Sequence, residues 1–428
     1  MLFRDITVIR ADGSELDHVC VGIKGPLIAC IGCEAPPGDW GEVIDGASYI
    51  LMPGLVNSHT HVPMTLLRGY GDDLPLDVWL NERIFPFEDK LTGEDVYWGS
   101  LLGIAEMLAS GTTSFSDMYY FCDRIAQAVY ESGIKANIGR GISCFDPGLK
   151  FFDLPAYGEV NELLCTVHGA DDGRILIDVA PHSEYTTRPD ILSDAAELAA
   201  KRGARIQIHV SETRKEHLEC VGRHGKTPVE VMRDTGLLSL PLTLAHGVWL
   251  SERDMALLAE HDVTVAHCPK SNLKLGSGIA QTDKLHKKGI SVAIGTDSAA
   301  SNNSLDMLEE MRTASLLAKG ISLDPAVLPA GKTLFMATRA GALSQGRDDC
   351  GDIAPGFRAD LVLLNRRSTR LHPGHSALSD IVYAANASAV AMTMADGQVL
   401  YRNGEFPTLD MERIRYHADR CVKRILGQ

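Results

Sequence analysis

The 428-residue chain is predicted to be an α/β protein: a (β/α)8 TIM-type barrel with a small β-sandwich domain built from both termini and a C-terminal helix. Two observations predict this fold. The middle of the chain alternates short apolar runs with helical patterns eight times, which is typical of a parallel barrel. Both ends carry short strands separated by turn residues. We therefore expect residues 1–53 and 352–428 to form the β domain and residues 54–351 the barrel.

The β domain is predicted from apolar runs near both termini. The pairs Asp12-Gly13 and Asp396-Gly397 are turn signals that link neighbouring runs. The expected elements are Leu2–Ile9, Val19–Ile23, Leu27–Ile31, Asp352–Leu364 (a turn that leads into a strand), Val390–Met394 and Val399–Tyr401. After Asp410, apolar residues recur at helical spacing from Ile414 to Ile425, so we expect an amphipathic helix on the surface.

The barrel is predicted from eight apolar runs, each followed by a helical pattern. Thr92 and Asp95 resemble a capping box, and Gly111 ends the helix that they begin. Pro189 and Gly203 bracket another helix in the same way. The expected strands are Leu55–Ser58, Thr112–Asp117, Ala136–Ile142, Ile175–Ala180, Ile206–His209, Leu242–Ala245, Val263–Ala266 and Val292–Gly295. The connection over residues 62–91 is far longer than an ordinary loop, which makes it a candidate lid.

Composition excludes several classes of partner. The net charge of −15 gives no electrostatic basis for binding nucleic acid or an anionic membrane. No apolar run approaches the ~20 residues of a membrane helix, and the first residues do not resemble a secretory signal. We therefore expect the ten cysteines to be reduced thiols in a cytoplasmic protein. The pair Cys30 and Cys33 lacks the second pair that a zinc tetrad needs, so two thiols in a β segment are favoured.

Metal-binding residue types collect where the predicted barrel strands end. His59 and His61 follow the first strand at alternate positions, so both side chains point to one side. An isolated pair of this kind is more often two surface histidines in a turn. Barrel enzymes, however, carry their functional residues at the carboxyl ends of the strands. The residues at these ends are His59, His61, His182, His209, His246, His267 and Asp297. For His267, a hydrogen-bonded core histidine stays open as an alternative.

Four of these residues form a candidate metal site. His59, His61, His209 and Asp297 offer three imidazoles and a carboxylate, a set that suits one divalent ion. We expect zinc, with iron as the alternative. Such an ion lowers the pKa of a bound water from ~15.7 toward ~7 and so provides a hydroxide nucleophile at neutral pH.

Three residues beside that site are candidates for proton transfer. Asp297 can hold the metal and also accept the proton of the attacking water. Glu212 lies three residues after His209, where a carboxyl can carry a proton to the substrate. The alternative for Glu212 is a solvated loop glutamate. His246 is placed to orient the nucleophile or to stabilise developing charge.

The chain resembles the amidohydrolase superfamily over essentially its whole length. The similarity is carried by Met52–His61, Gly295–Ser298 and Gly356–Val362. Members with two metals use a lysine on the fourth strand, and the segment Ile175–His182 contains none. The resemblance is therefore to the one-metal subgroup, in which the His209-x-x-Glu212 arrangement serves hydrolytic deamination.

Within that subgroup the chain is most similar to deaminases of 5′-methylthioadenosine and S-adenosylhomocysteine. The resemblance implies that Glu88 holds the ribose hydroxyls, that Arg140 and His182 line the pocket and that Trp79 covers it. Two alternatives stay open: Glu88 as a helix-start carboxylate, and Arg140 as an ion-pair partner inside the barrel. The matching stretches are Pro63–Gly69, Pro86–Thr92, Ser271–Gly276 and Ala299–Ser304. The segment 144–158 has no clear second pocket arginine, which leaves the preference for a charged 5′ tail open.

The implied reaction is hydrolytic deamination of the adenine ring in 5′-modified adenosines, which yields inosine analogues and ammonia. The candidate substrates are 5′-methylthioadenosine, S-adenosylhomocysteine, 5′-deoxyadenosine and adenosine. The partner is thus a small-molecule nucleoside, and a homo-oligomer is common among such proteins. Two alternatives remain: another one-metal amidohydrolase that acts on a free nucleobase, pterin or s-triazine, and a catalytically dead barrel that serves as a scaffold.

Overall fold

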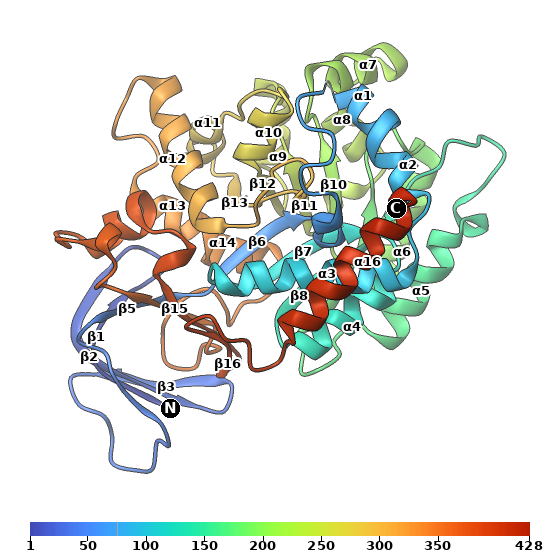
Figure 1. The fold of residues 1–428 in the computed structure, drawn as a ribbon. Helices are drawn as coiled ribbons and strands as arrows, with labels where there is room; N and C mark the ends of the chain where they lie inside the picture. The colour runs from blue at the N-terminus through green and yellow to red at the C-terminus, as the bar shows by residue number, and fades with distance from the viewer. Residues whose placement is uncertain (75) are drawn as a thin grey trace.

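A computed structural model, which describes residues 1–74 and 76–428, contains two large sheets (Figure 1). The first is parallel and has eight strands, in the order β13-β12-β11-β10-β9-β8-β7-β6. The strands are β6 (Leu55–Thr60), β7 (Thr112–Tyr119), β8 (Lys135–Ile142), β9 (Ile175–Pro181), β10 (Ile206–Val210), β11 (Leu242–His246), β12 (Val263–His267) and β13 (Ser291–Ile294). Each of the eight predicted strands is present, which confirms the predicted barrel.

The first and last strands of the barrel meet. The backbone N–H of Asp297, just after β13, donates to the carbonyl of His59 on β6 over 2.9 Å. Gly295 allows this approach, because a Cβ at that position would lie 2.9 Å from the backbone N and O of His59. Residues at opposite ends of the barrel sequence therefore become neighbours at one end of the barrel.

Helices cover the outside of the barrel (Figure 1). They are α3 (Gly93–Ala109), α4 (Cys122–Ser132), α5 (Pro155–Thr166), α6 (Pro189–Arg202), α7 (Arg214–His224), α8 (Pro228–Asp234), α9 (Glu252–Leu258), α10 (Pro269–Lys274), α11 (Thr282–Lys287), α12 (Met307–Ser322), α13 (Ala330–Ala337) and α14 (Arg339–Ser344). The predicted cap of α3 is present, since the Thr92 N–H donates to the Asp95 carboxylate over 2.7 Å. None of the described helices is long and apolar enough to cross a membrane.

The connection predicted as one long loop over residues 62–91 folds into short helical turns, apart from residue 75, which lies outside the described residues. The turns are a 3-10 helix (Val62–Leu67), α1 (Leu76–Trp79), a π-helical turn (Leu80–Ile84) and α2 (Phe85–Glu88). Buried apolar side chains, among them Val62, Leu67 and Phe87, pack against the helices of the barrel. Tertiary packing therefore organises this segment.

The second sheet is mixed and joins both ends of the chain. Its strands are β1 (Leu2–Ile9), β2 (Glu15–Lys24), β3 (Leu27–Gly32), β4 (Val43–Asp45), β5 (Tyr49–Pro53), β14 (Leu361–Asn365), β15 (Val390–Ala395) and β16 (Gln398–Arg402). Strand β5 pairs with both β1 and β14 and so connects the two termini. Edge strand β3 also bonds to residues 356–358, just before β14, so the sheet curls around one apolar core.

The chain ends in the predicted amphipathic helix, α16 (Met411–Leu426). The Asp410 carboxylate caps it by accepting from the Arg413 N–H over 3.0 Å. Ile414, Ala418 and Ile425 are buried against α3 of the barrel. Figure 1 shows α16 lying along α3. The sequence grouped this helix with the β domain, whereas its apolar face packs on the barrel.

Candidate metal centre and active site

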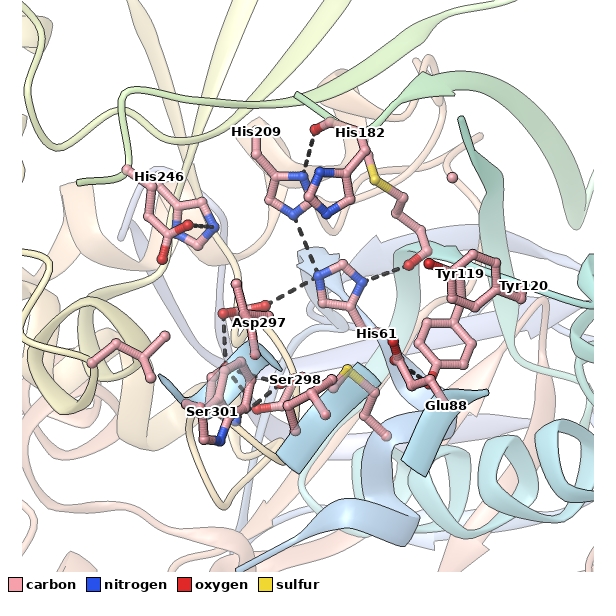
Figure 2. A pocket seen from close by; sticks show the side chains of 18 of the residues that line it. His61, Glu88, Tyr119, Tyr120, His182, His209, His246, Asp297, Ser298 and Ser301 are labelled. Carbon is pink, nitrogen blue, oxygen red and sulfur yellow. Dashed lines mark hydrogen bonds and ion pairs between the residues drawn. The ribbon is translucent and has the colours of Figure 1, made fainter. Parts of the chain in front are cut away.

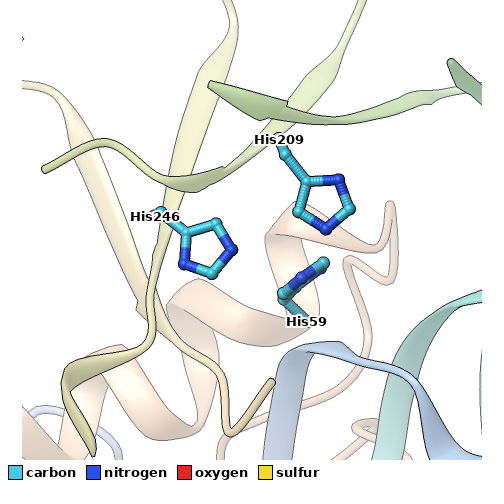
Figure 3. A group of neighbouring side chains, drawn as sticks. All are labelled: His59, His209 and His246. Atoms are coloured by element: carbon cyan, nitrogen blue, oxygen red, sulfur yellow. The ribbon is translucent and has the colours of Figure 1, made fainter. Parts of the chain in front are cut away.

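The four predicted metal ligands converge at the carboxyl ends of the barrel strands. Figure 2 shows His61, His209 and Asp297, and Figure 3 shows His59 beside His209. The Asp297 Oδ1 atom lies 3.3 Å from His61 Nε2 and 3.7 Å from His59 Nε2. His209 Nε2 lies 3.4 Å from His61 Nε2. A second group of potential ligands shares His59 and combines it with His209 and His246 (Figure 3). The structure thus places every predicted ligand, and His246 beside them, around one point.

Hydrogen bonds at the far side of two imidazoles define which nitrogen is free. His61 Nδ1 lies 2.5 Å from the Met118 carbonyl, and His209 Nδ1 lies 2.7 Å from the His182 carbonyl. Because a carbonyl oxygen only accepts, both Nδ1 atoms carry the hydrogen. In its neutral form, each ring presents its Nε2 lone pair to the centre, as metal-binding histidines do.

The two oxygens of the Asp297 carboxylate have different partners. Its Oδ2 atom accepts hydrogen bonds from Ser271 Oγ over 2.5 Å and from Ser301 Oγ over 2.8 Å. Its Oδ1 atom is left facing His59 and His61. Burial raises the pKa of this carboxyl, but the hydrogen bond and charge of His61 outweigh burial and hold the pKa well below its usual range.

The pKa values of two imidazoles in the cluster are shifted in opposite directions. Burial opposes protonation of His61, yet the hydrogen bond to Asp297 raises the pKa of His61 to about 9. Burial lowers the pKa of His59 well below its usual value. His59 Nε2 is buried and has no hydrogen-bond partner among the described residues. An unpartnered nitrogen beside an ionised carboxylate fits a metal ligand.

The backbone is strained around the cluster. His246 has a φ of 72° and Asp297 a φ of 60°, and Ser211, which precedes Glu212, has a φ of 50°. Non-glycine residues avoid this left-handed region, at a cost on the order of 1 kcal/mol each. Surrounding hydrogen bonds hold these conformations, and they aim the side chains of the cluster.

Glu212 and His246 lie on one side of the cluster. Glu212 Oε1 accepts from Ser277 Oγ over 3.3 Å, and Glu212 Oε2 lies 3.9 Å from His246 Nε2. His246 Nδ1 lies 2.9 Å from the Asn272 side-chain oxygen, which turns Nε2 toward the cavity. Glu212 is only 9% exposed, and burial raises its pKa. This burial argues against the alternative in which Glu212 is a solvated glutamate in a loop.

Glu88 lies across the cavity from His246 (Figure 2). Tyr119 Oη donates a hydrogen bond to Glu88 Oε1 over 2.6 Å. Glu88 ends a continuous helical run that begins at Leu76 and passes through the π-helical turn into the four-residue α2, so it does not stand at the start of that run. Trp79 and His182 line the same cavity, and burial lowers the pKa of His182 to about 4.

Arg140 differs from the other residues predicted to line the pocket. Its Nε atom lies 2.5 Å from Glu159 Oε2, and its Nη1 atom donates to the Gly141 carbonyl. The guanidinium lies over the ring of Tyr120, 4.9 Å from the ring centroid. Arg140 is not among the described residues that line the cavity, and it forms an ion pair, the alternative that the sequence left open.

His267 also lies apart from the cavity. It is buried on β12, and burial lowers its pKa to about 3. Its Nδ1 atom has no hydrogen-bond partner among the described residues. His267 is therefore a neutral histidine of the core.

Sequence reasoning missed several residues that line the cavity. Their shared feature is a position at or after the end of a barrel strand, where the strand-end rule could have found them. They are Tyr119, the last residue of β7, Tyr120 directly after it, Tyr185 after β9, and Ser298 and Ser301 after β13. The predicted second strand ended at Asp117, two residues before the observed end at Tyr119, and this hid both tyrosines.

Comparison with known proteins gives one consistent family. The sequence pattern of the amidohydrolase family matches residues 50–400. A 5-methylthioadenosine/S-adenosylhomocysteine deaminase of Syntrophomonas wolfei is 41% identical over 433 aligned residues, which cover 100% of each chain. A 5′-deoxyadenosine deaminase of Methanothermobacter thermautotrophicus is 44% identical over 416 residues, 97% of each chain.

Solved structures agree with the sequence comparisons. A zinc-bound adenosine deaminase from Xanthomonas campestris has a TM-score of 0.94 and 34% identity, covering 100% of this chain and 98% of its own. An atrazine chlorohydrolase from Arthrobacter aurescens has a TM-score of 0.92 at 22% identity, covering 98% of this chain and 99% of its own, and that likeness shows the fold alone. The chain belongs to the amidohydrolase family.

Proposed function

We propose that the chain is a one-metal aminohydrolase that removes the 6-amino group of adenine from 5′-modified adenosines. The products are the inosine analogue and ammonia. One observation carries the proposal: a buried carboxyl of raised pKa, Glu212, stands beside the ligand cluster, and a second carboxyl, Glu88, faces it across the cavity. The first suits proton transfer to a ring nitrogen, and the second suits two sugar hydroxyls. The names of the relatives above support this substrate class.

His59, His61, His209 and Asp297 would hold one divalent ion, with Zn²⁺ as the first candidate and Fe²⁺ as the second. Nitrogen and oxygen donors suit both ions, and the zinc in the Xanthomonas structure supports the first. When bound, the ion supplies a coordinated water of lowered pKa. We assign His246 to the substrate side, because its Nε2 faces Glu212.

Each of the polar groups then has a task. Glu212 donates its proton to N1 of the adenine, which makes C6 more electrophilic. Asp297 Oδ1 accepts one proton of the attacking water and passes it to the departing amine, while Ser271 and Ser301 hold Oδ2 in place. The second proton of that water returns Glu212 to its protonated form. His246 donates from Nε2 to the oxygen that adds at C6 when it is protonated, or orients that oxygen when it is neutral.

At the other end of the cavity, Glu88 would accept hydrogen bonds from the ribose hydroxyls. Tyr119 occupies one of its oxygens and fixes its direction. His182 and Trp79 would contact the nucleoside from the sides. A cytoplasmic location is part of the proposal, because all ten cysteines are free thiols.

The test is Glu212→Gln, measured with zinc-loaded protein and 5′-methylthioadenosine. Glutamine keeps the size of the side chain and removes the transferable proton. We expect kcat to fall by about 10²–10⁴-fold while zinc content stays at one per chain. Full activity in this variant would remove Glu212 from proton transfer and leave the proposal without its central observation.

A further inference from the structure

The cavity wall on the side of Glu88 carries apolar side chains. Trp79, Leu80 and Ile84 line the cavity and come from the same helical segment as Glu88. Tyr120 lies on the same side of the cavity as Glu88 (Figure 2). Among the described residues that line the cavity, none is a lysine or an arginine. In the orientation proposed above, the adenine points to His246 and the ribose to Glu88, so the 5′ substituent of the nucleoside meets this wall.

Arg140 is a cation that contacts the cavity wall but does not itself line the cavity. It contacts two wall residues, through a hydrogen bond to the Gly141 carbonyl and through the ring of Tyr120. The Glu159 carboxylate, on α5, lies 2.5 Å from its Nε atom. Glu159 therefore neutralises the charge of Arg140 and holds the guanidinium against Tyr120, while Arg140 itself does not line the cavity.

We propose that Glu159 is a specificity-determining residue that favours uncharged 5′ groups by withholding Arg140 from the cavity. This inference rests on the proposed function. An amino-acid tail, such as that of S-adenosylhomocysteine, would bring a carboxylate and an ammonium to an apolar wall. With Arg140 already paired, the tail carboxylate meets no free cation among the described residues that line the cavity, and it loses hydration at an apolar wall. A methylthio or 5′-deoxy group has no such cost.

The experiment separates charge from length with two substrates. S-adenosylhomocysteine and 5′-butylthioadenosine have 5′ chains of similar length, but the butyl chain is uncharged. For the wild-type enzyme we expect kcat/KM to be at least about tenfold higher for the butyl compound. Glu159→Gln removes the competing charge and keeps the side-chain shape. It should raise kcat/KM for S-adenosylhomocysteine about tenfold and leave the value for 5′-butylthioadenosine within about twofold.

A double variant shows whether the gain acts through Arg140. Adding Arg140→Gln to Glu159→Gln should return S-adenosylhomocysteine to the wild-type value. Zinc content and Tm establish that both variants are folded, and Glu159 is 45% exposed at its side chain, which favours tolerance of the change.

Four outcomes overturn the inference. Equal wild-type turnover of the two substrates would show that charge is not discriminated, while deamination itself would stand. An equal rise for both substrates in Glu159→Gln, or a gain that survives loss of Arg140, would remove the pair from specificity. No turnover of any 5′-substituted adenosine would overturn the proposed function, and this inference with it.

Discussion

At the scale of single residues, the turn that carries Glu212 is held by a second glutamate. Glu216 accepts the backbone N–H groups of Ser211 and Glu212 over 2.7 Å each, and that of Thr213 over 3.4 Å. Glu216 is buried, and the turn that it binds includes the strained Ser211. It is a positioning residue for Glu212, because it touches the backbone of the turn.

Glu216→Gln tests this role. The amide nitrogen would face one of the N–H donors, so the turn would lose one acceptor and shift. We expect kcat to fall by about 10–100-fold with KM and zinc content nearly unchanged. The matched control is Glu219→Gln on the same helix, where the side chain is 52% exposed and kcat should not change. If both variants keep full kcat, the turn does not need Glu216.

Glu88→Ala tests the recognition of ribose. Glu88 should contribute only when a sugar is present. We expect kcat/KM for 5′-deoxyadenosine to fall by about 10–100-fold and the low rate on free adenine to stay the same. The measurement is the initial rate of deamination of 5′-deoxyadenosine and of free adenine by the variant and the wild type. A variant that still prefers the nucleoside by the wild-type ratio would show that other residues recognise the sugar.

Residue positions at strand ends were predictable, whereas ion pairing was not. His59, His61 and Asp297 follow apolar runs, and barrel geometry alone brings such positions together. The partner of Arg140 is Glu159, on a different element, and the sequence has no local signal for such a pair. The burial of Glu212 against Ser277 likewise depends on the loop after β12.

At the scale of elements, a buried ion pair joins the barrel to the mixed sheet. Lys135 opens β8, and its ammonium lies 2.5 Å from Asp360 Oδ2 and 2.7 Å from Asp396 Oδ1. Burial opposes the charge on Lys135, but Asp360 outweighs it and raises the pKa of the lysine. Both acids come from the segment that returns to the sheet.

Lys135→Met should therefore destabilise the protein strongly. It leaves the buried Asp360 carboxylate without its cation, whereas Asp396 keeps Arg358, whose Nη1 lies 3.2 Å from Asp396 Oδ1. We expect a loss of about 3–5 kcal/mol in the free energy of unfolding, measured by urea denaturation. Lys287→Met is the control, because Lys287 is 71% exposed and should change stability by less than about 1 kcal/mol. Equal effects of the two substitutions would contradict this account of the junction.

Helix α12 places a buried acid beneath the turn of Asp297. Glu310 Oε1 accepts from Asn302 Nδ2 over 2.7 Å, and the same amide donates to the Thr296 carbonyl over 2.7 Å. Burial raises the pKa of Glu310 to about 8, above its ordinary value near 4.5. The folded state thus keeps a proton that the unfolded chain releases. The stability gained from this proton is complete below about pH 4.5 and is lost as the pH rises to about 8.

Glu310→Gln isolates that effect. The stability of the wild type should fall relative to the variant between about pH 5 and 8, with a slope of at most about 1.4 kcal/mol per pH unit. Thermal unfolding at several pH values provides the measurement. Glu309→Gln, at a side chain that is 46% exposed, should follow the wild type. Parallel curves for wild type and Glu310→Gln would mean that Glu310 is ionised in the folded protein.

The elements differ in how far sequence could predict them. The eight strands and the helix after Asp410 have a clear apolar period, and capping residues mark several helix ends. The segment 62–91 has no such period, because its turns are short 3-10, α and π pieces that are stable only when packed. The packing of α16 on α3 depends on tertiary contacts, which its own period does not encode.

At the scale of the whole molecule, the ligand cluster joins distant parts of the chain. His59 comes from β6, His61 from the position directly after β6, His209 from β10 and Asp297 from the turn after β13. An ion bound by all four would stabilise the closed barrel, because the unfolded chain does not keep this arrangement. The order of strands in the sequence predicted the barrel and a sheet built from both ends of the chain. The curl of that mixed sheet could not be predicted, because it depends on hydrogen bonds between β3 and residues 356–358.

Removal of the metal should lower Tm as well as activity. At a free zinc concentration of 100 times Kd, binding contributes about 2.7 kcal/mol, and a chelator removes this contribution. We expect zinc, added back, to restore both Tm and turnover. An apoprotein that melts at the same temperature as the zinc-loaded protein would contradict a structural contribution of the ion.

The most direct test of the central claim is a substrate panel with zinc-loaded enzyme. It would follow ammonia release and the change from adenine to hypoxanthine absorbance. The panel contains 5′-methylthioadenosine, 5′-deoxyadenosine, adenosine, free adenine, guanine and a chloro-s-triazine. The account predicts turnover of the 5′-modified adenosines, with an inosine analogue and ammonia in equal amounts, and little turnover of the free bases. Turnover of a free base or the triazine alone would contradict the role of Glu88 and the proposed substrate class.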